Sequence, residues 1–94
     1  MASRTFHCYA VVCSSAEKQP VLLPKKGSNR SYLLVENRSA GAIYMAFEQV
    51  PTVNDGILIQ AGAVYELDNV VPDGKIFLAG SLSTDQRINI TEAY

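Results

Sequence analysis

The apolar positions of the chain recur in short extended runs and show no sustained helical period. The runs return at intervals of about 8 to 12 residues and are separated by Gly, Pro, Asn and Asp, as in strands joined by turns. This rhythm predicts an all-β fold, a small antiparallel β-sandwich of the jelly-roll or Ig-like type with about seven or eight short strands. The expected strands are Phe6–Val12, Val21–Leu23, Tyr32–Glu36, Ala42–Glu48, Ile57–Gln60, Val64–Asp68, Lys75–Leu82 and Arg87–Thr91.

The length of 94 residues corresponds to a single domain. Within it we expect residues 1–31 to form an N-terminal strand and a long basic loop or arm, and residues 32–94 to form the core of the sandwich. The loop is expected because the segment from 13 to 30 contains two prolines, two adjacent lysines and a Gly-Ser-Asn cluster. The N-terminal third is therefore predicted to be the least regular part of the domain.

The stretch GILIQAGAVYELD, residues 56–68, joins two of the expected strands. Gly62 suits the third position of a type II turn, which requires a positive φ. Type II geometry splays the strands of a tight hairpin, so we expect residues 60–63 to form a corner that carries the chain between two sheets. Ile57 and Ile59 are then predicted to face the core, and Leu58 to face outward.

Several large side chains remain on the outward faces of the expected strands after the core has been assigned by alternation. Their number exceeds the scattered exposure expected of a small monomer. Either loops such as residues 13–30 fold over one sheet, or these side chains lie at subunit contacts, where Tyr and Phe are enriched. The residues are Tyr9, Leu34, Tyr44, Leu58 and Phe77.

The composition is apolar for a small domain, with 48% hydrophobic and 18% charged residues, which indicates that some apolar surface meets a partner. The net charge of −1 argues against nucleic-acid binding, which requires an excess of Lys and Arg. Charge is uneven, however, since the segment from Lys18 to Arg30 carries four positive residues and no acid. This segment is either an ordinary solvated loop or a basic patch that orients the protein on a partner.

Catalytic and metal-binding patterns are missing from the sequence. His7 is the sole histidine and has no second ligand at metal-binding spacing. Glu66 and Asp68 share a strand face, but nothing in the sequence suggests a raised carboxyl pKa. Cys8 and Cys13 would face opposite sides of a strand, too far apart for a disulfide, and we expect both to be buried or half-buried. The prediction is a protein without catalytic residues, cofactor or metal, and not an enzyme.

The N-terminal apolar run is too short for a membrane span and poorly shaped for a signal peptide. We therefore expect synthesis in a cytoplasm and no membrane partner.

The chain from Tyr32 to Glu92 resembles small β-sandwich virion proteins of tailed bacteriophages. The resemblance lies in an apolar strand ending in Asn-x-Ser, a strand with Ile-Tyr, a loop with Asp-Gly before a glycine corner, a Val-Pro-x-Gly turn and a final alternating strand. These motifs are LLVENRS, AIYMAF, NDGILIQAGAVYEL, VVPDG, KIFLAGS and RINITEA. Some such proteins are capsid decoration or cement proteins, so the resemblance implies a role in binding rather than in chemistry.

The resulting expectation is a capsid decoration or cement protein that binds and stabilises the major capsid lattice, made in the bacterial host cytoplasm and located on the capsid surface. Its expected partners are the major capsid protein and copies of itself, as a dimer or trimer. A tail, neck or fibre component that recognises a host glycan or protein is the alternative. The expected apolar contacts are Leu34, Tyr44, Leu58 and Phe77, and the expected electrostatic contacts are Lys25, Lys26 and Arg30.

Overall fold

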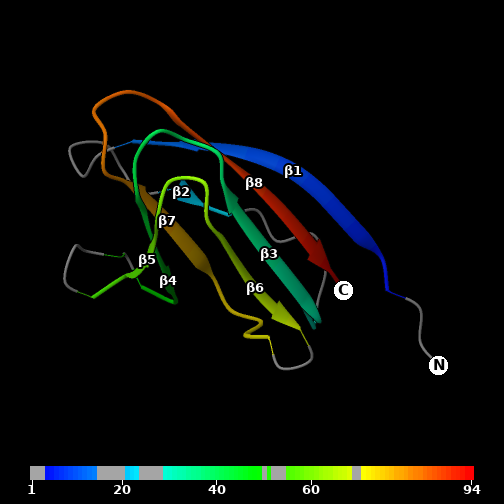
Figure 1. Ribbon diagram of the computed structural model, residues 1–94. Coiled ribbons are helices and arrows are strands. Elements are labelled where there is room, and N and C mark those ends of the chain that lie inside the picture. The colour runs from blue at the N-terminus through cyan, green and yellow to red at the C-terminus, as the bar shows by residue number, and fades with distance from the viewer. Residues whose placement is uncertain (1–3, 15–20, 24–28, 50, 52–54, 69–70) are drawn as a thin grey trace.

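The computed structural model describes residues 4–14, 21–23, 29–49, 51, 55–68 and 71–94. These residues form strands and connecting turns, and no helix in the described ranges is long and apolar enough to cross a membrane (Figure 1). The strands are β1 (Phe6–Cys13), β2 (Val21–Leu22), β3 (Tyr32–Asn37), β4 (Ile43–Phe47), β5 (Ile57–Ile59), β6 (Val64–Asp68), β7 (Ile76–Gly80) and β8 (Gln86–Ala93).

The strands form two antiparallel sheets of four. The first sheet has the order β1-β8-β3-β6 and the second sheet has the order β2-β7-β4-β5. The pairs β1 with β8, β2 with β7, β3 with β6 and β4 with β5 are all present. This nested pairing arises when one long hairpin, with its tip between β4 and β5, wraps into two layers, and it is the jelly-roll arrangement of eight strands. The predicted β-sandwich is confirmed, and its topology is the jelly-roll alternative.

Each expected strand corresponds to an observed strand, and its ends differ from the observed ends by at most two residues. β6 has the predicted bounds. The inner faces follow the predicted alternation, since Ile43, Met45, Ile76 and Leu78 are fully buried. Leu33, Val35, Ile88 and Ile90 from the first sheet pack into the same cluster. The core is thus built by short alternating runs from both sheets, with burial of aliphatic side chains as its main source of stability.

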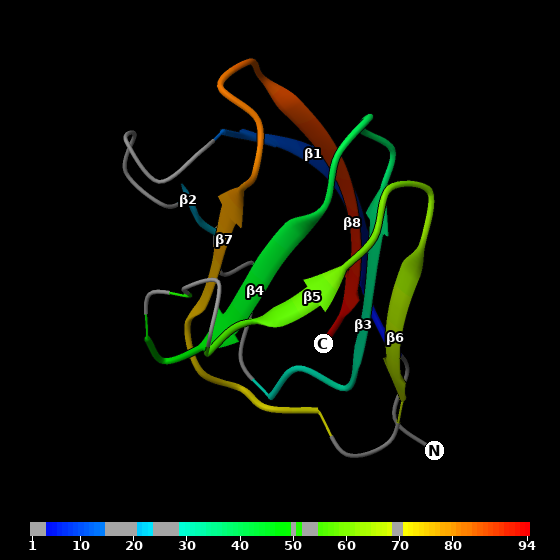
Figure 2. The same ribbon diagram turned by 60° about the vertical axis from the view of Figure 1, so that its left-hand side comes forward.

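The corner at residues 60–63 has the predicted geometry. Gly62 has a φ of 79°, and the Ala63 amide donates a hydrogen bond of 3.0 Å to the Gln60 carbonyl. β5 belongs to the second sheet and β6 to the first, so the turn carries the chain from one layer to the other (Figure 2). Ile59 is buried, Ile57 is half-buried and Leu58 is exposed, as the alternation predicts.

β1 pairs with β8 over its whole length and is an integral edge strand of the first sheet. Its inner face includes Tyr9, which packs against the core, so the expectation of an outward Tyr9 is wrong. Cys13 is buried as expected, whereas Cys8 is exposed because it lies on the opposite face of the strand. Both cysteines are free thiols.

Two buried amides hold the loops at one end of β3 and β8, and we call them the amide cluster (Asn37 and Gln86). The Gln86 side chain accepts hydrogen bonds from the amides of Ser81 and Leu82 and donates to Ser39 and to two carbonyls of the β3–β4 loop. The Asn37 side chain donates to three backbone carbonyls from that loop and from the end of β5. In these loops, hydrogen bonds from the neutral side chains of Asn37 and Gln86 therefore satisfy backbone groups that have no partner in a neighbouring strand.

Candidate functional site

The outer face of the second sheet carries only apolar and aromatic side chains at its described strand positions. The strand register aligns these side chains in two rows that each cross three strands. One row is Leu22, Phe77 and Ala46, and the other is Ala79, Tyr44 and Leu58. We call these six residues the apolar face.

Four larger side chains form the solvent-facing part of the apolar face. Each alanine lies opposite an aromatic residue on the neighbouring strand, Ala46 beside Phe77 and Ala79 beside Tyr44, and both alanines are buried. Leu22 is 48% exposed and Leu58 is 50% exposed, while Tyr44 and Phe77 are half-buried. The large side chains left accessible here form one continuous apolar stretch on the surface of the second sheet.

A polar rim bounds one end of the apolar face at Glu48 and Lys75. Glu48 has a φ of 65°, and its side-chain Oε1 accepts a hydrogen bond of 3.0 Å from the Lys75 amide. A Cβ atom at position 74 would lie 1.6 Å from that oxygen, so a larger residue there would displace the Glu48 side chain from this hydrogen bond. The strained backbone of Glu48 thus directs its carboxylate to the Lys75 amide, where it accepts the hydrogen bond that a backbone carbonyl accepts in a regular strand pair. This hydrogen bond holds the two rim residues together.

A cleft of about 440 Å³ lies beside this rim and continues the apolar face at Leu22. Its walls combine leucine side chains with charged groups, an arrangement that suits an apolar anchor with a polar border. The cleft is lined by Leu22, Leu23, Arg30, Glu48, Asp73, Gly74 and Lys75.

The structure divides the expected interface residues between two faces. Tyr44, Leu58 and Phe77 share the apolar face. Leu34 is half-buried on the outer face of the first sheet, on the other side of the sandwich. Leu22 was missing from the expected set because β2 has only two residues, too few for alternation to identify its outward side chain. Lys25 and Lys26 lie outside the described residues.

Arg30 was expected to be an exposed docking charge, and this expectation is wrong. Its side chain is 2% exposed, and Nε donates a hydrogen bond of 2.6 Å to Oε2 of Glu92. Nη1 donates to the carbonyl oxygens of Pro72 and Gly74. The guanidinium is held inside because a buried carboxylate and two carbonyls replace the water that it loses.

Arg30 belongs to a group of two buried and two half-buried side chains that we call the ionic cluster (Tyr9, Arg30, Glu92 and Tyr94). Glu92 accepts hydrogen bonds from the hydroxyl groups of Tyr9 and Tyr94, and the Arg30 guanidinium carbon lies 5.8 Å from the centre of the Tyr94 ring. Burial raises the pKa of Tyr9 above its ordinary value, and the hydrogen bond to Glu92 raises it further. The cluster joins β1 and the end of β8 to the turn before β7, and Arg30 also contributes to the wall of the cleft beside Leu22.

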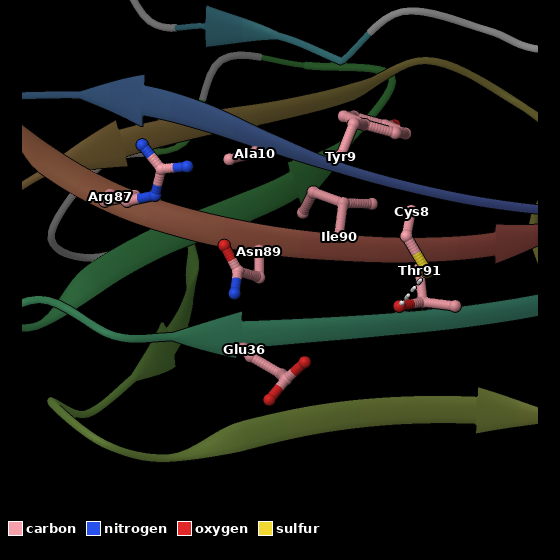
Figure 3. A pocket seen from close by; sticks show the side chains of 8 residues that line it. All are labelled: Cys8, Tyr9, Ala10, Glu36, Arg87, Asn89, Ile90 and Thr91. Atoms are coloured by element: carbon pink, nitrogen blue, oxygen red, sulfur yellow. Dashed lines mark hydrogen bonds between the residues drawn. The ribbon is translucent and has the colours of Figure 1, made fainter.

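The outer face of the first sheet mixes polar side chains with the exposed apolar side chains of Phe6, Val12 and Val64, and it contains a shallow hollow of about 350 Å³ (Figure 3). Arg87 lies at one end of this hollow, and Cys8 with Thr91 lies at the other. The Cys8 sulfur is 3.4 Å from the Thr91 hydroxyl oxygen. We call this depression the polar hollow, and it is lined by Cys8, Tyr9, Ala10, Glu36, Arg87, Asn89, Ile90 and Thr91.

The residues considered for catalysis have structural partners. His7 packs edge-on against the Tyr94 ring at 6.1 Å between ring centres. Glu66 accepts a hydrogen bond from Tyr32, which raises the pKa of Tyr32 to about 12, and Asp68 pairs with Arg4 at 3.0 Å. Within the described ranges, His, Cys, Asp and Glu side chains form no group of three that could hold a metal ion.

The sequence matches no protein-family model, and it has no significant match among curated proteins. The fold, the two outer faces and the sequence motifs are therefore the grounds for assigning a function.

Proposed function

We propose that this protein is a structural component of a bacteriophage virion, a capsid decoration or cement protein whose apolar face binds the major capsid protein. The observation that carries the proposal is the apolar face itself, in which four strands present only aliphatic and aromatic side chains at their described outward positions. A binding role requires such a surface on a rigid support, and the jelly-roll sandwich supplies the support.

The size of the apolar face favours binding to a lattice over a tight isolated complex. Four strands, each about 4.8 Å wide, and two rows of side chains, each about 7 Å wide, give a patch of roughly 19 by 14 Å, or about 270 Å². A stable pair of proteins buries about 800 Å² on each partner. The patch alone is therefore a modest contact, and many copies on a repeating shell would convert modest contacts into firm attachment through avidity.

The sequence motifs support a virion role independently of the surface. The phage-like motifs fall on consecutive elements from β3 to β8, including the corner at residues 60–63 and the turn before β7. Lys25 and Lys26 remain the expected electrostatic contacts with a shell. Arg30 is not one of them, because its charge is neutralised by Glu92 inside the sandwich.

The test is sedimentation of the purified protein with phage procapsids and with expanded heads. Leu58→Asp places a charge at the exposed end of an apolar row, so capsid occupancy should fall by about tenfold or more. The matched control is Val64→Asp, which changes an exposed apolar strand residue, 61% accessible, on the first sheet. This control should keep wild-type occupancy, and both variants should show unchanged thermal unfolding.

Equal loss of binding in the Leu58 and Val64 variants would show that the apolar face is not the docking surface. Binding to tails with no binding to either form of the head would replace the capsid proposal with the alternative of a tail or neck component.

A further inference from the structure

The polar hollow lies on the opposite side of the sandwich from the apolar face. Asn89 is at its centre, directly opposite Ala10 on β1 and Glu36 on β3. Arg87 and Thr91 flank Asn89 two positions away along β8, so all three side chains point outward from the same strand. The hollow forms because the small side chain of Ala10 lies among longer neighbours (Figure 3).

The polar groups of the hollow retain unused hydrogen-bonding capacity. In the part of the chain that the structure describes, no hydrogen bond or ion pair engages the Arg87 guanidinium or the Asn89 amide. Glu36 contacts Arg38 at 3.4 Å through Oε2, and no hydrogen bond between described residues uses its Oε1. The hollow therefore offers donors from Arg87, acceptors from Glu36, and both kinds of group from Asn89.

The balance of charge restricts the ligand that this arrangement suits. The lining carries one cation, Arg87, and one anion, Glu36, so neither a strongly anionic nor a strongly cationic ligand is matched by the whole site. A ligand with several neutral groups that both donate and accept hydrogen bonds satisfies all three side chains at once. Sugar hydroxyl groups have this property, and the apolar side chains of Ala10 and Leu34 lie beside the polar groups to contact a C–H face.

We propose that the polar hollow is a binding site for carbohydrate, with Arg87, Asn89 and Glu36 as its hydrogen-bonding residues. Its volume of about 350 Å³ lies within the range of roughly 300–1,000 Å³ for small-ligand sites. The open, shallow shape suits one or two sugar units bound with low affinity. This activity goes beyond capsid binding and does not depend on it, because the two surfaces lie on opposite sheets.

The test is a nuclear magnetic resonance titration of the isotope-labelled full chain with methyl glycosides of glucose, galactose, mannose and N-acetylglucosamine. At least one glycoside should cause saturable shifts of the backbone signals of Ala10, Glu36, Arg87, Asn89 and Thr91. Arg87→Thr and Asn89→Val should each weaken binding by about tenfold, the effect of losing one such hydrogen bond. Both replacements favour strands, and unchanged spectra elsewhere in the domain would show that the variants are folded.

Leu58→Asp, on the opposite face, is the control and should leave glycoside binding unchanged. A titration with inorganic phosphate separates a sugar site from an anion site. Saturable shifts of the same signals by phosphate but by no glycoside would overturn the proposal. Absence of shifts with all four glycosides, or equal glycoside affinity in the wild type and both hollow variants, would also overturn it.

Discussion

The two buried polar clusters occupy opposite ends of the same strands, β3 and β8, but are built from different chemistry. The amide cluster at Asn37 and Gln86 contains neutral groups that hydrogen-bond to loop backbone. The ionic cluster at Arg30 and Glu92 contains a charged pair whose side chains are 2% and 0% exposed. Burial of a neutral amide costs little free energy when all its hydrogen bonds are made inside the protein. Burial of a charge is tolerated only when its partner is present.

Equally buried polar groups therefore differ in how much the fold depends on each of them. The amide cluster fixes loops, so its loss should act on the residues around it. The ionic cluster joins segments far apart in the chain, since Arg30 lies just before β3 and Glu92 lies near the end of β8. Its loss should leave an uncompensated charge in the interior, with effects on the whole sandwich.

The largest effect is expected for Glu92→Ala. Removal of the carboxylate leaves the Arg30 guanidinium buried without its counter-charge, and the free energy of unfolding should fall by about 3–5 kcal/mol. Urea unfolding followed by circular dichroism measures this change. Glu66→Ala is the matched control, because Glu66 is an exposed acid with a tyrosine partner, and it should lose less than about 1 kcal/mol. Similar losses in both variants would contradict the importance of the buried pair.

A smaller effect is expected for Gln86→Ala. This change leaves the amides of Ser81 and Leu82 without their side-chain acceptor and should reduce the free energy of unfolding by about 2–3 kcal/mol. Amide hydrogen exchange should accelerate most at Ser81 and Leu82. Gln60→Ala, at an exposed glutamine, is the control and should change neither quantity. Acceleration spread evenly over the sandwich would show that the amide cluster does not act locally.

The smallest effect is a loss of stability in alkali, to which Tyr9 of the ionic cluster and the buried Cys13 of the core contribute and the amide cluster does not. Tyr9 has its pKa raised above the ordinary 10.0 by burial and by Glu92, and burial raises the pKa of Cys13 to about 11. Both groups stay protonated in the folded state at a pH where the unfolded chain has lost the protons. Their stabilisation is therefore complete below about pH 9 and declines as the pH rises above that value.

The urea midpoint, measured from neutral pH to pH 11, should fall less steeply in Tyr9→Phe and in Cys13→Ala than in the wild type. Gln86→Ala should keep the wild-type slope, because no proton is released from the amide. A slope unchanged in both Tyr9→Phe and Cys13→Ala would contradict this assignment of the alkaline loss.

Much of the fold was predictable because alternation and turn residues act locally. Gly62 identified the corner, and the aliphatic runs of β4 and β7 identified their core faces. Burial of Glu92 was also readable in principle, since it continues the inward series Ile88 and Ile90 at a spacing of two. It was missed because the expected last strand ended at Thr91, whereas β8 extends to Ala93.

The sites were less predictable because they depend on which strands become neighbours. Tyr44, Leu58 and Phe77 were recognised as outward, but only the strand order places them on one face. Arg30 appeared as part of a basic loop because its partner lies 62 positions away. No sequence pattern identifies the polar hollow, because Glu36, Arg87 and Asn89 are ordinary surface residues in the sequence. They come together only when β3 pairs with β8.

The nested pairing of the strands also determines when the fold can form. Phe6 pairs with Ala93, so β1 finds its partner strand only after the roughly 80 residues that follow it have been made. Contacts between such distant residues carry a large loop-closure entropy, and folds dominated by them reach the native state in milliseconds to seconds. Until then β1, with its apolar residues, is open to pairing with other chains. The topology that gives this small domain two separate faces thus also makes it a slow folder that depends on the pairing of β1 with β8.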